Sequence, residues 1–148
     1  MPDIVPSVRS IIDCRRQLRS DRALLVAISG IDSSGKGYCS ELMKQNLEGA
    51  GFKTALIHAD GWLNLPNIRF GTPNPARHFY EHAFRFDEMF RSLLVPLRDR
   101  RSVSLTFDFA EETATDYRKE QVAYNDIDIV LVECIFLLKK DLRSQYDW

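Results

Sequence analysis

Apolar residues along this chain follow two patterns: short runs of consecutive apolar positions, and longer stretches in which they recur every three or four positions. The runs are ALLVAIS at 23–29, the mostly apolar KTALIHA at 53–59 and DIVLVECIF at 128–136. Such runs are typical of strands that are covered on both faces of a parallel sheet. The helical spacing is found at 6–20, 36–50 and 77–99. We therefore predict an α/β fold with helices on both faces of a mostly parallel sheet.

The segments between these elements have weaker patterns. Residues 61–77 hold two Gly, three Pro and three Asn, which predicts a long loop. The segment 102–109 alternates apolar and polar residues as an exposed strand does, and Pro96 should bend the end of the last predicted helix. The length of 148 residues fits one domain, with an N-terminal helical region at 1–22 and a core at 23–148.

Composition narrows the classes of partner. Twenty Lys and Arg residues against twenty-one Asp and Glu leave a net charge of −1, so we expect no broad basic surface for nucleic acid or an anionic membrane. No apolar run approaches the roughly 20 residues that span a bilayer. The three cysteines lack metal-ligand spacing, and no signal-peptide pattern opens the chain. These features predict a cytoplasmic protein.

The first apolar run leads into a loop rich in glycine and serine, SGIDSSGKGY at 29–38. Three of its residues match the frame G-x-x-x-x-G-K, in which backbone N–H groups and a helix N-terminus bind phosphate oxygens while the lysine adds positive charge. The alternative is an ordinary turn between strand and helix. The position between a buried strand and an amphipathic helix favours phosphate binding. The predicted phosphate-binding residues are Gly30, Ser33, Ser34, Gly35, Lys36, Gly37 and Tyr38.

Gly37 stands where this pattern usually has Ser or Thr, whose hydroxyl group ligates Mg²⁺ at the terminal phosphates. Mg²⁺ keeps several water ligands in most protein sites. We therefore expect weakened or rearranged metal coordination, with phosphate binding retained. Ser34 could supply a substitute hydroxyl or form ordinary hydrogen bonds within the loop.

Two acidic residues lie at the ends of the other predicted strands. Asp60 follows the second run and Glu133 lies near the end of the third. Because ligands gather at the carboxyl ends of parallel strands, both should face the phosphate loop. Asp60 could accept a proton or hold a metal ion, or it could only form a turn. The positive charges of the long loop, Arg69 and Arg77, could meet an anionic acceptor or lie in solvent.

With these residues in view, the chain resembles the uridine kinase and phosphoribulokinase-like family of P-loop small-molecule kinases. The resemblance runs from about 23 to 138 and rests on SGIDSSGKG, HADGW, FRFDEMFRSLLVPL, FDF and VLVECIF, in this order. It implies that the loop at 30–36 holds ATP phosphates and that Asp60 is the general base for the acceptor hydroxyl, with Trp62 in an aromatic position beside it. Glu133 matches the acid of the family's Glu-Gly segment.

The resemblance also implies that Asp60, Trp62, Asp108 and Arg118 help to bind the acceptor. Phe107 replaces a tyrosine of the family, Cys134 replaces a glycine, and no histidine stands near Arg118, where uridine and cytidine kinases place one. The family pattern therefore points to a small hydroxyl compound, with a nucleoside as one candidate.

The function expected from these features is ATP-dependent and Mg²⁺-dependent transfer of phosphate to a small hydroxyl compound. Asp60, Lys36 and Glu133 are the candidate catalytic residues, and Asp60 and Glu133 are the candidate metal ligands. The alternative is a nucleotide-binding regulatory module, or a truncated homologue with little turnover. Family members continue with two more strands and a lid, so we expect the P-loop fold to lack these. The strand at 23–29 would then be an edge, which could pair in a homo-oligomer.

Overall fold

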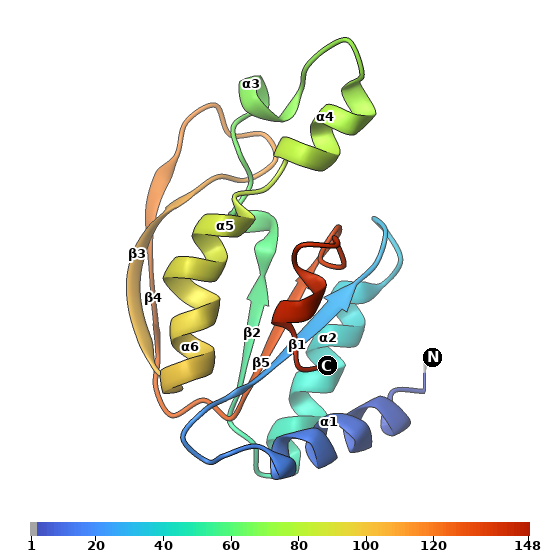
Figure 1. Cartoon of the computed structure of the whole chain (residues 1–148), viewed down its shortest axis with the longest axis vertical. Helices are drawn as coiled ribbons and strands as arrows, with labels where there is room; N and C mark the ends of the chain where they lie inside the picture. Colours follow the sequence, from blue (N-terminus) through green and yellow to red (C-terminus); the bar gives the residue numbers. More distant parts are fainter. Residues whose placement is uncertain (1–2) are drawn as a thin grey trace.

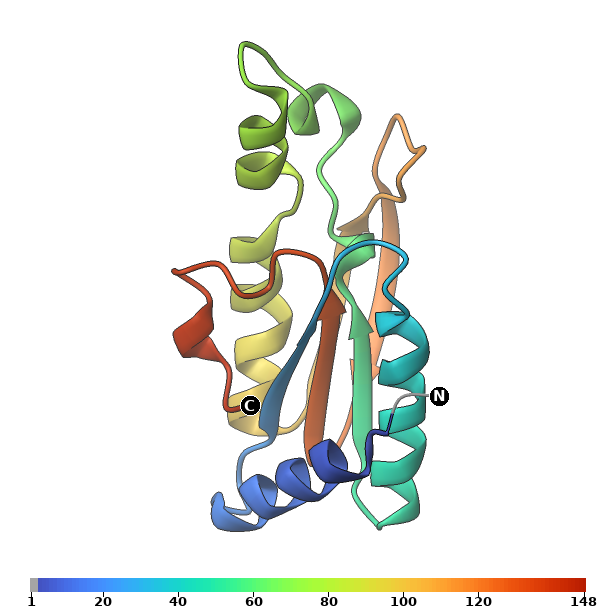
Figure 2. The ribbon, with the colours of Figure 1, turned by 90° about the vertical axis from the view of Figure 1, so that its right-hand side faces the viewer.

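The computed structural model describes residues 3–148. Its centre is a parallel sheet with the strand order β1-β5-β2. β1 spans Leu24–Ser29, β2 spans Thr54–His58 and β5 spans Ile129–Cys134. Helices cover both faces of this sheet, and the three strands all finish at the same end (Figures 1 and 2). The predicted three-layer α/β arrangement is confirmed.

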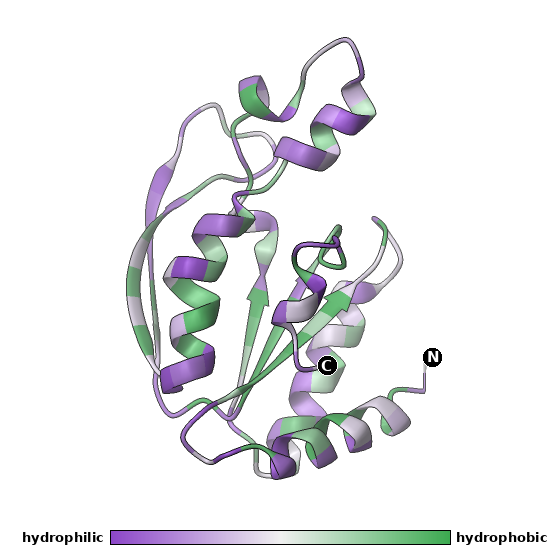
Figure 3. Ribbon diagram, in the orientation of Figure 1, coloured by the Kyte–Doolittle hydropathy of each residue, from purple (hydrophilic) through white to green (hydrophobic). Residues whose placement is uncertain are grey.

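The strands are mostly apolar because their residues pack into clusters on both faces of the sheet. Leu24 and Val26 of β1 pack toward α1 and α2, whereas Leu25 between them packs into the cluster on the opposite face. β5, in the middle, is buried at every position. Figure 3 shows these strands as hydrophobic over most of their length. The absence of polar alternation in the sequence thus follows from the two helical layers.

The first two predicted helices form close to their expected boundaries. α1 spans Val5–Gln17 and α2 spans Lys36–Gly49. Their buried residues, which include Ile11 and Leu47, share one cluster with β1 and β5. The amphipathic spacing therefore marked the faces that contact the sheet.

The third predicted helix, 77–99, is interrupted. α4 spans Pro75–His82, and the helix resumes only at Phe86. The residues between pair with the chain after β2: the Asn64 N–H bonds to the Ala83 carbonyl at 2.8 Å, and the Arg85 N–H bonds to the Trp62 carbonyl at 2.8 Å. These long-range bonds replace helical ones, which the local periodicity could not reveal.

The resumed helix consists of α5 (Phe86–Met89), a π-helical segment (Phe90–Leu94) and α6 (Val95–Arg100). Pro96 lies in the first turn of α6. A proline ring cannot fit against the carbonyl group four residues before it in a regular α-helix. The wider π turn directly before α6 accommodates this ring, so the predicted irregularity occurs before the proline and not in the last turn.

The rest of the second half forms a hairpin. β3 (Val103–Phe109) was predicted and pairs antiparallel with β4 (Arg118–Tyr124), which was not. Alternate residues of both strands, such as Leu105 and Val122, pack against the cluster that holds α5 and α6. β4 is rich in polar residues (RKEQVAY), so its sequence does not indicate a half-buried strand.

The long predicted loop contains short helices. A 3₁₀ turn at Ala59–Gly61 follows β2 directly, and α3 spans Pro66–Arg69 before α4 begins. Figures 1 and 2 show α3 and α4 beyond the end at which the parallel strands finish. This segment therefore stands over the edge of the sheet where sequence analysis places the site.

β1 is an edge strand, as expected, and the last residues of the chain lie along part of it. After the 3₁₀ turn at Arg143–Gln145, the Asp147 N–H bonds to the Leu25 carbonyl at 2.8 Å, and the Ala27 N–H bonds to the Trp148 carbonyl at 3.0 Å. These bonds satisfy polar groups that an open edge would leave unpaired. Among the described residues, no helix is both long enough and apolar enough to cross a membrane.

Candidate functional site

The glycine-rich loop joins β1 to α2 in a conformation that depends on two glycines. A Cβ atom on Gly30 would stand 2.8 Å from the Ser34 side-chain oxygen. Gly35 has φ of +83°, in the left-handed region that other residues rarely adopt. The loop therefore folds tightly over its own residues and turns into α2 at Gly35.

α2 begins without a side-chain cap, because its N-cap residue is Gly35. The N–H groups of Lys36 and Gly37, in the first helical turn, have no acceptor within the helix. No acidic residue stands in this first turn, so the positive end of the helix dipole is not neutralised there. The buried Ser40 hydroxyl donates to the Gly37 carbonyl at 2.8 Å and is occupied within the helix. This combination of features can bind an anion.

Lys36 extends back over the loop toward the end of β5. Its Nζ lies 3.4 Å from the Ile31 carbonyl oxygen, 3.6 Å from Glu133 Oε1 and 3.8 Å from Asp32 Oδ1. The Lys36 side chain is only 14% exposed, whereas that of Asp32 is 88% exposed. The buried partner of the ammonium group is therefore Glu133, which places a positive charge between the loop and the end of the sheet.

Glu133 is the buried acid at the centre of the site. It is 4% exposed and lies level with Ile28 of β1 and His58 of β2 in the sheet. Its second oxygen, Oε2, lies 2.8 Å from His58 Nδ1. Lys36 and His58 thus contact the two oxygens of one carboxylate, and together they stabilise a charge that would otherwise be costly to bury.

Asp60 stands beside this cluster, in the 3₁₀ turn after β2. Burial is the main cause that raises the pKa of its carboxyl group, and repulsion from Glu133 raises it further. The Cys134 thiol lies 3.9 Å from Asp60 Oδ1, at hydrogen-bond distance for sulfur. Burial also raises the pKa of that thiol, so Cys134 is a protonated donor to Asp60.

These carboxylates suit a divalent cation. Asp60 and Glu133 repel each other, and a cation between them would relieve this repulsion. Among residues 3–148 there is no cluster of three or more His, Cys, Asp or Glu side chains that could hold a metal ion by itself. Mg²⁺ at nucleotide sites is commonly held by one or two carboxylates together with phosphates and water. Asp60 and Glu133 are therefore the residues that fit Mg²⁺.

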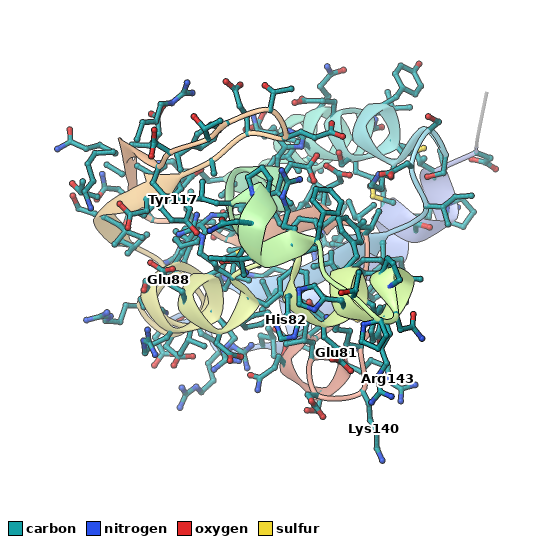
Figure 4. All side chains as sticks on the ribbon, turned by 90° about the horizontal axis from the view of Figure 1, so that it is seen from above. Glu81, His82, Glu88, Tyr117, Lys140 and Arg143 are labelled. Carbon is teal, nitrogen blue, oxygen red and sulfur yellow. The ribbon has the colours of Figure 1, made fainter. Side chains whose placement is uncertain are left out.

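A cavity of about 620 Å³ opens next to Asp60. Its walls come from the end of β2, from α3 and α4, and from the turn between β3 and β4. Its aromatic lining residues are Phe70, Phe79, Phe84 and Phe109. Figure 4 looks down on this end of the molecule, with Glu81 and His82 of α4 on one side and Tyr117, before β4, on another. Asp32, His58 and Asp60 connect the cavity to the phosphate loop.

Three residues that the resemblance assigned to the acceptor lie outside this lining. Trp62 is 2% exposed and stacks on Phe107 with ring centroids 4.3 Å apart. Lys119 holds the Asp108 carboxylate at 2.6 Å and lowers its pKa. Arg118 pairs with Glu120 at 3.0 Å. Within the described residues, Trp62 supports the cavity wall from behind, and the other two lie on the hairpin.

Sequence reasoning missed much of the cavity wall. Phe79, whose helical spacing predicts a core residue, is partly buried against the core cluster and also lines the cavity. Phe109 reaches the cavity through Gly61, since a Cβ atom on Gly61 would stand 2.6 Å from the Phe109 ring. Arg69 also lines the cavity and is 2% exposed, so it is not a solvated loop arginine. Its positive charge in the loop after Asp60 was the sequence signal, and it left open whether Arg69 meets an anionic acceptor or lies in solvent.

No family model matches this chain. Uridine kinases from two strains of Staphylococcus epidermidis are each 28% identical to it over 131 residues, which cover 86% of this chain and 60% of each relative. The chain thus spans less than two thirds of the length of these relatives.

Solved structures share the fold. A possible uridine kinase from Bacillus stearothermophilus has a TM-score of 0.75 at 22% identity, covering 96% of this chain and 79% of that protein. A candidate fructose transport system kinase from Silicibacter sp. has a TM-score of 0.73 at 18% identity, with 99% and 72% covered. A D-glycerate 3-kinase from Cryptococcus neoformans has a TM-score of 0.59 at 16% identity, with 93% and 53% covered. The resemblance to uridine kinase-like P-loop kinases is confirmed.

Proposed function

We propose that this chain transfers the terminal phosphate of ATP to a hydroxyl group of a small molecule. One observation carries the proposal: the uncapped N-terminus of α2, the Lys36 ammonium group and two acidic side chains meet at one end of the sheet, next to a cavity of about 620 Å³. An anion site and an acceptor cavity side by side are what a phosphotransferase needs. The curated uridine kinases similar to this chain support the same class of reaction.

The residues of the loop would have separate roles. The N–H groups from Gly30 to Tyr38 would bind phosphate oxygens, and Gly35 supplies the left-handed turn that directs them inward. Lys36 would leave its contact with Glu133, 3.6 Å away, for the phosphates. Its positive charge would then offset the negative charge that develops on the transferred group.

Asp60 would act as the general base. The acceptor oxygen attacks the terminal phosphorus, its proton passes to an Asp60 carboxylate oxygen, and ADP leaves with the bond to the bridging oxygen broken. Burial and Glu133 raise the pKa of Asp60, which makes it a stronger base than an exposed aspartate. Asp60 lines the cavity, so an acceptor bound there would meet it.

Asp60 and Glu133 would hold Mg²⁺, which supplies charge neutralisation at the phosphates when bound. His58 contacts Glu133 Oε2 at 2.8 Å and orients this carboxylate. Gly37 supplies no hydroxyl ligand, so the phosphates and water would provide the remaining ligands.

Release of ADP in the presence of a panel of acceptors tests the proposal. The panel contains uridine, fructose and glycerate, each supplied with ATP and Mg²⁺. Asp60→Asn should abolish release because the amide cannot accept the proton, while ATP affinity measured without Mg²⁺ is retained. The control is Asp13→Asn on the exposed face of α1, which should leave release unchanged. Equal turnover in Asp60→Asn and the unmodified chain would remove the catalytic role of Asp60.

A nucleotide-binding module with little turnover is the second candidate. The observation that favours it is Gly37, which removes the usual hydroxyl ligand of Mg²⁺. Saturable ATP binding without ADP release for any acceptor would identify this case.

A further inference from the structure

Arg69 is a buried cation beside the acceptor cavity. It ends α3, lines the same cavity as Asp60, and is 2% exposed. Its Nη2 donates to the Glu112 carbonyl oxygen at 2.6 Å, and its guanidinium carbon lies 5.2 Å from the centroid of the Phe70 ring. These contacts hold the side chain between α3 and the turn that joins β3 to β4.

Within the described part of the chain, the guanidinium group has no anionic partner. Among residues 3–148, no carboxylate oxygen lies within 4.0 Å of an Arg69 nitrogen, and its Nε is buried without a hydrogen-bond acceptor. Other partly buried arginines of this chain have such partners: Arg15 lies 3.6 Å from Asp128, and Arg85 lies 3.0 Å from Glu88. Arg69 therefore differs from Arg15 and Arg85 in two ways: its charge is not paired with a carboxylate, and it lines the cavity.

A structural role alone does not account for this arrangement. The bond to the Glu112 carbonyl could be made by any neutral donor, whereas a buried charge without a partner is costly. Proteins keep such costs mainly at functional sites. From the charge of Arg69, its missing counter-ion and its place in the cavity wall, we infer that the acceptor carries a carboxylate group that pairs with Arg69. This inference rests on the proposed function, since it names the acceptor class of that reaction.

The other acidic residues of the cavity leave room for this carboxylate. Asp32 and Asp60 lie on the side of the phosphate loop, where Lys36 supplies positive charge. Glu111 and Glu112, on the side of the hairpin, are exposed residues whose charge is screened by solvent. A small hydroxy acid would place its hydroxyl at Asp60 and its carboxylate at Arg69, with the aromatic lining around its carbon chain. Guanidinium suits this task because it binds carboxylates through paired hydrogen bonds.

Calorimetry on the whole 148-residue chain tests acceptor binding without requiring turnover. The probes are glycerate, 4-hydroxybutyrate and gluconate, each compared with its own neutral amide. We expect at least one acid to bind about 10- to 150-fold more tightly than its amide, the range expected for a hydrogen bond to a charged group. Arg69→Gln should remove this preference, and Arg69→Lys should keep part of it.

Arg77→Gln is the matched control. Arg77 lies in the neighbouring α4, but it is exposed and already paired with Glu81 at 2.9 Å, so its loss should not change the preference. Thermal unfolding and ATP affinity show whether Arg69→Gln is folded. If it is not, the comparison of acids with amides in the unmodified chain and in Arg69→Lys decides the question.

The outcomes separate the two proposals. Failure of every acid to bind more tightly than its amide, or a preference that survives in folded Arg69→Gln, would overturn the role of Arg69. ADP release with uridine or fructose in that case would leave the phosphotransferase proposal standing. Acid binding that depends on Arg69, without ADP release in any mixture, would support this inference and count against the phosphotransferase.

Discussion

Gly35→Ala tests whether the backbone conformation of the loop makes the phosphate site. Gly35 has φ of +83°, and an added Cβ atom would meet nothing within 4 Å. The cost is therefore conformational and not steric, about 1–2 kcal/mol of unfolding free energy for a left-handed alanine. In a domain of this size that corresponds to a fall in Tm of about 2–8 °C.

Gly51→Ala provides a matched control at the other end of α2. Gly51 has φ of +93° and the same open surroundings, so its substitution should lower the unfolding free energy by a similar amount. Urea unfolding measures this free energy in both variants. A fluorescent ATP analogue, titrated at fixed Mg²⁺, measures affinity.

The two variants should differ in nucleotide binding. If the alanine introduced by Gly35→Ala relaxes toward a right-handed conformation, the N–H groups at the start of α2 rotate away from the bound phosphate. Loss of one hydrogen bond to a charged group costs about 1.5–3 kcal/mol, or about 10- to 150-fold in affinity. Gly51→Ala should bind as the unmodified chain does. Unchanged affinity in a Gly35→Ala variant that loses clearly less stability than Gly51→Ala, and whose alanine has therefore relaxed out of the left-handed conformation, would refute the idea that the turn at Gly35 forms the site.

Three further predictions concern the metal, the general base and the fold. Gly37→Ser restores a hydroxyl in open space, so the Mg²⁺ concentration that half-saturates ATP binding should fall without loss of stability; an unchanged Mg²⁺ titration would contradict this. Asp60→Asn should raise stability at neutral pH but not at low pH. The pKa of Asp60 is raised in the folded protein, so its negative charge lowers the unfolding free energy only as the pH rises through that pKa. If the unfolding free energies of the variant and the unmodified chain differed by the same amount at every pH, this reasoning would be wrong. Asp128→Ala removes bonds to Arg101 and to the Lys53 N–H, both 2.8 Å long, and should cost about 1–3 kcal/mol in urea unfolding.

The elements that the sequence predicts best are those whose own residues show the pattern of buried positions. β1 and β5 are apolar on both faces, and α1 and α2 have one apolar stripe each, so local patterns are enough. The motif around Lys36 predicts the loop because strand, loop and helix are consecutive in the chain. Asp60 and Glu133 could be placed at one edge because parallel strands end together.

Features that depend on distant contacts were not predictable in this way. The break after α4 exists because Ala83 and Arg85 bond to residues about twenty positions earlier. Phe79 has the spacing of a core residue and packs against the core, but this spacing does not indicate that it also lines the cavity. The burial of Arg69 results from the turn after β3, more than forty positions later in the chain. The local spacing of apolar residues gives no information about such distant contacts.

Titration of the ¹⁵N-labelled chain with ATP and Mg²⁺, followed by amide NMR shifts, tests the central claim most directly. If the turn between β1 and α2 holds the phosphates, the amides from Gly30 to Tyr38 should shift in a saturable way, with the largest changes at Lys36 and Gly37, whose N–H groups start the helix. Shifts that leave these amides unchanged at millimolar ATP, or that gather at the far end of the sheet near α1, would contradict the account.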